Sequence, residues 1–323
     1  MRDFMKKAAR YAAFLGLFFL LNAGLGNAFI AAMPDRAGAR SHLSQVFAEG
    51  HTPHVLVVGD SHPMCAVDPS RVTGLVNAAW IGQRYDISYN LLERVFRRRP
   101  GEVEIVVLPL ERHSFARDRF LQPLRDPSSR RFEDTLYIGW RTGLFEEQAY
   151  ALMRYEIFPY LGAVDVLLDP SNPCEKLRDY ERHYPNGLAD NADAQGLAEV
   201  TAQLHAASGV WWEEVLADYF VAILDKCRHE HVQAVVVSYP VSTPYWEAIQ
   251  ALVPLAPWRE RVAALLKAYP EVPVLDYARF AQDRPSFFID SDHVNPRYAG
   301  EFTEKLHRDL MAVHNPPGRG AGK

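Results

Sequence analysis

The distribution of apolar and polar residues along the chain predicts about five buried strands that alternate with helices. Short runs of β-branched and aliphatic residues are typical of strands covered on both faces. Between these runs, apolar residues recur at helical spacing, as in the amphipathic stretch 85–99. The predicted strands lie at 54–58, within 72–79, and at 103–110, 232–239 and 272–277. The alternation favours an α/β fold, a three-layer sandwich around a central parallel sheet of about five strands.

The first apolar run ends at Gly59-Asp60-Ser61, a sequence suited to a sharp turn into a helix. Glycine gives the backbone freedom to turn, and Asp60 and Ser61 are both common at helix N-termini. Open α/β sheets bind their ligands at the carboxyl ends of the strands, where this serine hydroxyl would lie. Ser61 is therefore a candidate nucleophile, and the alternative is that Asp60 or Ser61 only caps the helix.

Near the other end of the chain, Asp290 and His293 are separated by three positions. A serine nucleophile needs a base to take its proton, and a carboxylate that orients the base. This spacing lets both side chains point in the same direction on one turn. Asp292 is adjacent to His293 and is expected to point elsewhere, which makes Asp290 the better orienter. By itself, the pair is also compatible with a surface turn or part of a metal site.

Taken together, Gly59-Asp60-Ser61 and Asp290-x-x-His293 resemble the first and last blocks of the SGNH/GDSL hydrolase superfamily. The continuation from His293 to Gly300 is most similar to the membrane-anchored branch that O-acylates polysaccharides, the alginate O-acetyltransferase and DltD-like proteins. The resemblance implies a catalytic triad of Ser61, His293 and Asp290. It spans the chain from about 54 to the last predicted helix, although only the two end blocks are specific.

The resemblance also bears on the oxyanion hole. A glycine of the second block supplies a backbone N–H in this superfamily, and Gly82 is the matching position, unless it is an ordinary turn glycine. The third block would carry Gly-x-Asn-Asp, which is missing here: the third predicted strand leads into Glu111-Arg112-His113-Ser114. Arg112 or His113 could replace the missing donor, or the hole uses only the N–H groups of Ser61 and Gly82.

Four segments are expected in the 323-residue chain. Residues 1–34 would form a cytoplasmic stub and a transmembrane anchor, 35–53 a polar stem, and 54–315 the SGNH-like catalytic domain. A mostly helical cap, about 115–210, interrupts that domain, and 316–323 form a Gly-rich tail expected to be disordered. Three side chains at the strand ends are candidate substrate contacts: His113, Tyr239 and Tyr245.

The anchor prediction rests on an uncharged, apolar stretch at 11–33, long enough to cross a bilayer. A cleaved signal peptide has a shorter core and ends in small residues, which Ala31-Ala32-Met33 matches poorly. Lys6, Lys7 and Arg10 precede the stretch, so the N-terminus is expected in the cytoplasm. The protein would then be a single-pass protein of the inner membrane, with its catalytic domain in the periplasm.

The composition of the chain limits the kinds of partner and cofactor that it is expected to bind. A net charge of −5 and the lack of a basic, aromatic groove argue against nucleic acid. The three cysteines, Cys65, Cys174 and Cys227, have no metal-ligand spacing, and no metal or other cofactor is expected. Cys65 lies close to Ser61 but has no base nearby in sequence, so it is interpreted as a small apolar filler.

The resemblance implies an extracytoplasmic O-acyltransferase, most simply an O-acetyltransferase, that acts on an exopolysaccharide or another envelope glycan through an acyl-Ser61 intermediate. Acyl-CoA is not available outside the cytoplasm, so a multi-pass membrane O-acyltransferase (MBOAT-type) partner would supply the acyl group. The alternatives are a membrane-tethered esterase that deacylates glycans or lipids, and a scaffold without catalysis.

Overall fold

The computed structural model describes residues 53–121, 132–144 and 186–314, and a few residues before them (10, 11, 13, 14, 16–22, 24 and 47). The chain divides into two compact units, one formed by 1–41 and 131–172, the other by 42–130 and 173–323. The second unit contains the sheet and all the predicted site residues.

Five parallel strands form the sheet, in the order β2-β1-β3-β4-β5. Their bounds are β1 Val55–Val57, β2 Leu75–Asn77, β3 Ile105–Pro109, β4 Gln233–Ser238 and β5 Val274–Asp276. Every residue of the central strands β1 and β3 is buried, as their continuous apolar sequences require. The predicted α/β fold with a parallel sheet of about five strands is confirmed.

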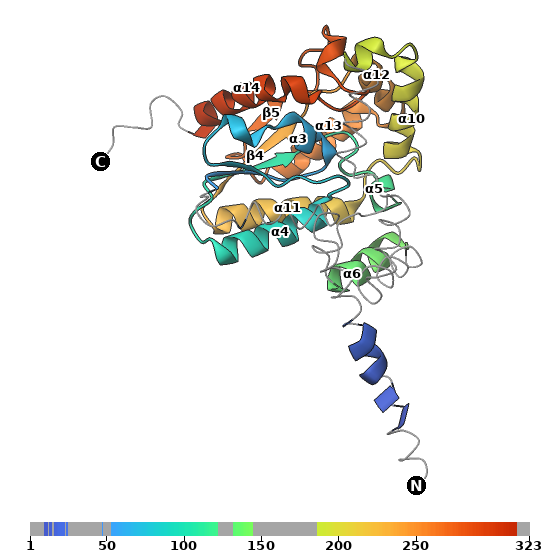
Figure 1. Ribbon diagram of the computed structural model, residues 1–323, viewed down its shortest axis with the longest axis vertical. Helices are drawn as coiled ribbons and strands as arrows, with labels where there is room; N and C mark the ends of the chain where they lie inside the picture. Colours follow the sequence, from blue (N-terminus) through green and yellow to red (C-terminus); the bar gives the residue numbers. More distant parts are fainter. Residues whose placement is uncertain are drawn as a thin grey trace, which may run out of the picture. The chain divides into compact units, whose positions relative to one another are not determined.

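Helices cover both faces of the sheet (Figure 1). On one face lie α4 (Tyr85–Arg98) and α11 (Glu214–His229), which pack against each other. On the other face α14 (Pro296–His314) packs on α3 (Ser61–Ala66). The three layers arise because each helix has an apolar stripe that the sheet buries.

A group of helices lies at the carboxyl ends of the strands, on the right of Figure 1: α5 (Asp118–Leu121), α10 (Ala194–Ala206) and α12 (Thr243–Leu252). The chain forms α12 and then α13 (Leu255–Leu266), because Pro254 cannot continue a helix and instead precedes the second one. Short 3₁₀ turns occur at Pro69–Arg71, Gly187–Asp190 and Pro285–Phe287.

The strand order reverses direction between β1 and β3. From β1 the chain first adds β2 on one side, and then β3, β4 and β5 in succession on the other. Loops that leave neighbouring strands in opposite directions open a crevice at the carboxyl ends, where open α/β sheets bind their ligands. The loops after β1 and β3 are therefore the expected place for a site.

Of the other unit, the structure describes α6 (Phe132–Thr142) and the helical residues between 10 and 24. Among the described residues, no helix combines the length and the apolar character needed to cross a bilayer. Most of the predicted anchor and stem lies outside the described residues. The same holds for 122–131 and 145–185 of the predicted cap, and for the tail.

Candidate active site

Ser61 begins α3 directly after the loop that leaves β1. Asp60 caps this helix, since its Oδ1 accepts the backbone N–H of His62 at 3.2 Å. Asn77, at the end of β2, fixes the helix further, because its side-chain amide donates to the carbonyl oxygens of Pro63 and Val67 at 2.9 Å each. The capping interpretation of Asp60 is confirmed, and it leaves the Ser61 side chain unused by the cap.

Gly59 makes the close approach of β1 and β3 possible. Its φ of +130° is strained for other residues. A Cβ at this position would lie 2.5 Å from Cγ of Pro109, the last residue of β3. Glycine is therefore required here by packing as well as by the turn, and it brings the loop after β1 against the loop after β3.

Asp290 and His293 lie on a tight loop before α14. Phe288 and Val294 form an antiparallel bridge, and the N–H of Ile289 donates to the carbonyl oxygen of His293 at 3.0 Å. Within this loop His293 Nδ1 lies 2.9 Å from Asp290 Oδ2, and the His293 backbone N–H donates to Oδ1 at 2.8 Å. The structure thus brings the predicted base and the predicted orienter together.

The other ring nitrogen, Nε2 of His293, is buried and has no hydrogen-bond partner in the part of the chain that the structure describes. With Nδ1–H donated to Asp290, Nε2 carries the lone pair in the neutral ring. The partly buried Ser61 does not bond to this atom, although its neighbour His62 has its ring centroid 5.2 Å from that of His293. Catalytic hydrogen bonds are often long without substrate, so the nucleophilic role of Ser61 stays a prediction.

His62 lies between two carboxylates. Its Nδ1 is 2.8 Å from Glu111 Oε1 and its Nε2 is 3.0 Å from Asp292 Oδ2. An imidazole that donates from both nitrogens carries both protons and a positive charge. Burial lowers the pKa of His62, but Glu111 and Asp292 outweigh burial and raise it well above its ordinary value. A buried imidazolium therefore holds α3 to the loops after β3 and before α14.

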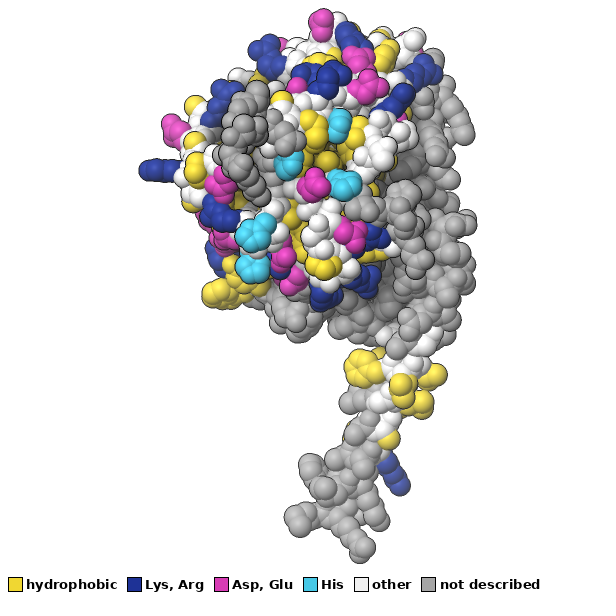
Figure 2. Space-filling view, turned by 90° about the vertical axis from the view of Figure 1, so that its left-hand side faces the viewer, with side chains coloured by type: hydrophobic (Ala, Val, Ile, Leu, Met, Phe, Trp, Pro, Cys, Tyr) yellow, Lys and Arg dark blue, Asp and Glu magenta, His cyan; other side chains and the backbone are white. Residues whose placement is uncertain are grey.

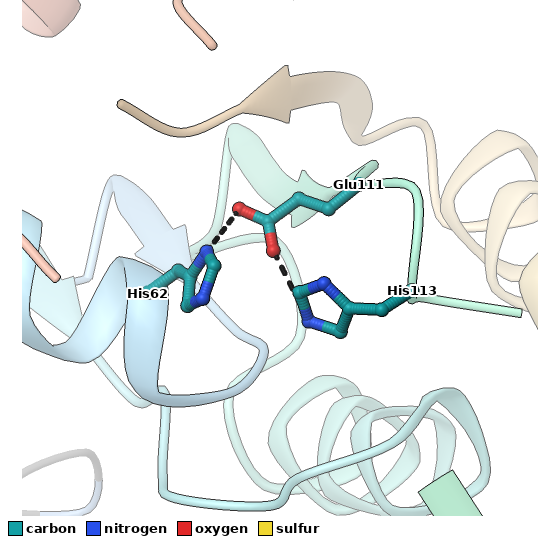
Figure 3. Close-up of side chains that lie close together, drawn as sticks. All are labelled: His62, Glu111 and His113. Carbon is teal, nitrogen blue, oxygen red and sulfur yellow. Dashed lines mark hydrogen bonds and ion pairs between the residues drawn. The ribbon is translucent and has the colours of Figure 1, made fainter. Parts of the chain in front are cut away.

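Glu111 also approaches a second histidine. In Figure 3 its carboxylate lies between the rings of His62 and His113, and Oε2 is 3.4 Å from His113 Nε2. His113 Nε2 is also 3.2 Å from Asp60 Oδ2, which Arg119 approaches at 2.9 Å. Burial raises the pKa of Asp60, but Arg119 and the neighbouring histidines hold it well below its usual range. Asp60 is thus an ionised member of the network as well as a cap.

The prediction that Asp292 points away from His293 is only partly right. Its Oδ1 lies 3.4 Å from His293 Nδ1, farther than Asp290 but within ion-pair range. Burial lowers the pKa of His293, yet Asp290 and Asp292 together raise it to about 9. Asp290 is the closer orienter, and Asp292 adds charge to the same ring.

Two groups of side chains have the donor atoms of a metal site. They are His62, Glu111 and His113, and His62, Asp292 and His293, with the donor atoms of each group within 4.8 Å of one another. Imidazole and carboxylate together suit a divalent cation such as Zn²⁺. Both groups depend on His62, whose proton a metal would have to displace. These two groups are where a cation would find ligands in the part of the chain that the structure describes.

The remaining predicted site residues lie around the same loops. Gly82 occupies the turn after β2 with φ +71°, and no contact of its N–H tests the oxyanion role. Tyr245 donates to, or accepts from, His205 Nδ1 at 2.7 Å and lies 3.4 Å from His113 Nδ1. Tyr239 is 1% exposed, and its hydroxyl has no partner among the residues described. Their roles as substrate contacts stay predictions.

Sequence reasoning missed His62, Arg119 and His205 as parts of the site. His205, on α10, stacks on His113 with ring centroids 4.3 Å apart. One signal was available: His62 follows Gly-Asp-Ser directly, and an imidazole beside a candidate nucleophile suggests a partner carboxylate. Arg119 and His205 have no comparable signal, because they come from α5 and α10, inside the predicted cap.

The surface differs from this interior. On the face shown in Figure 2, acidic and basic side chains are interspersed and histidines lie among them. That mixture agrees with the small net charge of −5. Inside the molecule, buried ionisable groups gather around His62 at the carboxyl edge of the sheet, and such clusters are typical of functional sites.

Comparisons with protein-family profiles and with curated proteins find no match. Among solved structures, a protein from Streptococcus pneumonia, named provisionally as a platelet activating factor, is similar to this chain. The alignment covers 94% of this chain and 99% of the other, at 12% sequence identity and a TM-score of 0.41. This likeness is too distant to carry an argument about family or activity.

Proposed function

We propose that the protein is a serine-dependent acyl-ester enzyme, and specifically an O-acyltransferase. The supporting observation is the state of His293: its Nδ1 is held by Asp290, while Nε2 is buried and unpartnered at the edge of the sheet where Ser61 begins α3. An oriented imidazole with one free nitrogen is what a hydroxyl nucleophile needs as its base.

In the proposed reaction, Ser61 Oγ attacks the carbonyl carbon of an acyl donor and its proton passes to His293 Nε2. The tetrahedral intermediate collapses, the bond to the leaving oxygen or sulfur breaks, and His293 returns the proton to that leaving group. The second half repeats these steps with an acceptor hydroxyl, which takes the acyl group from Ser61. Asp290 stabilises the imidazolium formed in each half.

The backbone N–H groups of Ser61 and Gly82 are the proposed donors to the oxyanion. One preorganised donor of this kind typically contributes about 2.7 to 4 kcal/mol to catalysis. His113 is already engaged by Asp60 and Tyr245, and no contact of Arg112 assigns it as a third donor. The proposal therefore uses two donors.

The resemblance of Asp290 to Gly300 supports transfer to a glycan hydroxyl over hydrolysis. The same resemblance, together with the apolar stretch 11–33, supports a membrane-anchored protein that works outside the cytoplasm, in a periplasm, and receives acetyl groups from an MBOAT-type partner. The alternative is an esterase that passes the acyl group to water. Both use Ser61, His293 and Asp290 in the same roles.

The test is to incubate the full chain in detergent with an aryl acetate ester, with and without a mixture of neutral and acidic oligosaccharides. Acetylated sugar supports transfer, whereas free acetate alone, in either condition, supports the esterase. Ser61→Ala is expected to lower both activities at least about a thousandfold.

Ser286→Ala is the matched control, because Ser286 is also partly buried, makes no side-chain hydrogen bond to the residues that the structure describes, and lies outside the cluster. It should retain full activity. Mass spectrometry of the quenched wild-type reaction should find the acetyl group on the peptide that contains Ser61. Activity that survives Ser61→Ala would contradict the proposal.

A further inference from the structure

A pocket beside the His62 cluster is lined by polar groups that have no partner. It lies between the loops after β3 and β4 and the helices α12 and α13, and its cavity volume is about 50 Å³. His62 and His113 form one wall, so the pocket opens next to the candidate active site.

Arg112 is the most unusual of these groups. The residue is only 6% exposed, and none of its three guanidinium nitrogens has a hydrogen-bond partner among the described residues. Its guanidinium carbon lies 3.8 Å from the ring centroid of Trp246, so the cation stacks on an indole face. Burial lowers the pKa of Arg112 to about 10, and Arg259 contributes in the same direction. A stacked arginine without an anion is an expensive arrangement in a protein interior.

Two further donors line the same pocket. The indole Nε1 of Trp258 and the hydroxyl of Tyr239 are both buried, and neither has a partner within the described ranges; these residues are 7% and 1% exposed. Buried polar groups are nearly always hydrogen-bonded in native proteins, so one such atom requires an explanation. Here an arginine, an indole and a phenol leave their donors unused around one small cavity.

The charges of the lining favour a negative ligand. Arg259 lies at the pocket, is exposed, and has no ion pair with the described residues. The lining contains two carboxylates. Glu111 is hydrogen-bonded to His62, and the exposed Asp276 accepts a hydrogen bond from the backbone N–H of Ala278. Asp276 acts on Arg112 through its charge, but its effect on the pKa of Arg112 is smaller than that of burial, and neither lining carboxylate forms an ion pair with Arg112 in the described part of the chain.

We infer that this pocket binds a compact oxyanion, a carboxylate or phosphate group, with Arg112 as its principal ligand and Tyr239 and Trp258 as further donors. A guanidinium matches both groups by paired, charge-assisted hydrogen bonds. The cavity volume of about 50 Å³ is enough for such a group. The pocket thus selects a charged substituent of a larger ligand.

If the proposed function holds, the charged substituent belongs to the acyl acceptor or donor. His62 lines the pocket, and its ring centroid lies 5.2 Å from that of His293, the proposed base. This assignment as a substrate subsite rests on the proposed function. Anion binding itself does not, since none of the pocket donors takes part in the proposed reaction.

The binding test uses calorimetry and tryptophan fluorescence at constant ionic strength. Inorganic phosphate and formate are the probes, and urea is the neutral control. Wild type and Ser61→Ala should bind at least one anion saturably and should not bind urea. Arg112→Met should weaken that binding about ten- to hundredfold, since a hydrogen bond to a charged group is lost, and Arg112→Lys should restore part of it.

Arg228→Met is the matched control: Arg228 also stacks on an aromatic ring, 4.5 Å from the centroid of Tyr269, but is paired with Glu271. It should leave anion binding unchanged. If phosphate binds more tightly than formate, the natural ligand group is assigned as a phosphate. If formate binds more tightly, it is assigned as a carboxylate. Equal binding by wild type and Arg112→Met, or no anion binding at all, would overturn the inference.

The two proposals can fail separately. Anion binding without any acyl chemistry would support the anion pocket and contradict the proposed function. Acyl chemistry without anion binding would support the proposed function and contradict the anion pocket. Thermal unfolding tests whether Arg112→Met loses anion binding only because it fails to fold. Without anion, this variant should be at least as stable as wild type, because an unpaired buried charge has been replaced by an apolar side chain.

Discussion

The pKa of His293 gives the proposed reaction a specific pH dependence. Burial lowers this pKa, and the carboxylates of Asp290 and Asp292 raise it more, to about 9 from the ordinary 6.5. At about 1.36 kcal/mol per pKa unit, the net effect of the carboxylates and burial favours the imidazolium by about 3 kcal/mol. His293 is therefore protonated at neutral pH and must lose its proton before it can activate Ser61.

The rate of the proposed reaction should rise with pH. Below the pKa the fraction of neutral imidazole rises tenfold per pH unit, so kcat/KM should rise with the same slope and level off above about pH 9. At pH 7 about 1% of the molecules would carry the neutral base. The assay is kcat/KM for an acetyl ester between pH 6 and 10.5, corrected for spontaneous hydrolysis, with an NMR titration of the His293 ring alongside it.

Asp290→Asn provides the perturbation. It removes the nearer carboxylate, so the inflection should move toward 6.5, while the plateau falls by as much as about 10⁴-fold because the imidazolium loses its orienting charge. Asp309→Asn is the control: Asp309 accepts a hydrogen bond from Tyr277 at 2.6 Å, on α14 and outside the cluster. The reasoning would be refuted by a rate that does not change between pH 7 and 9, or by an inflection that Asp290→Asn leaves in place.

Two predictions concern stability and are measured by urea unfolding. Gly59→Ala should destabilise more than Gly101→Ala, because both glycines have positive φ but only a Cβ at Gly59 meets Pro109, while nothing lies within 4 Å at Gly101. The Gly101 variant should lose about 1 to 3 kcal/mol from backbone strain, and equal losses would contradict the packing argument. Arg84→Met should cost about 3 to 5 kcal/mol, because Asp86, paired with Arg84 at 2.8 Å, stays buried and charged. The double replacement with Asp86→Leu should recover most of this loss, and a double variant as unstable as the single one would argue against it.

The sequence alone predicted the strands and the two polar blocks. The apolar runs of β1 and β3 are continuous, and strands of this kind are recognised from composition without tertiary information. The Asp290 and His293 contact was also predictable, because a separation of three residues on one loop sets the geometry locally. The break between α12 and α13 also has a local cause, since Pro254 cannot continue a helix.

The tertiary structure alone decided the interior of the site. His62 meets carboxylates 49 and 230 positions away, and no local pattern relates such residues. The sequence presented Arg112 only as a possible replacement for the missing oxyanion donor, and gave no sign that it would be buried. Its significance depends on burial and on the missing partner, which exist only after the loops after β3 and β4 have closed around it. Local sequence fixes which backbone segments form, whereas desolvation and pairing are properties of the packed chain.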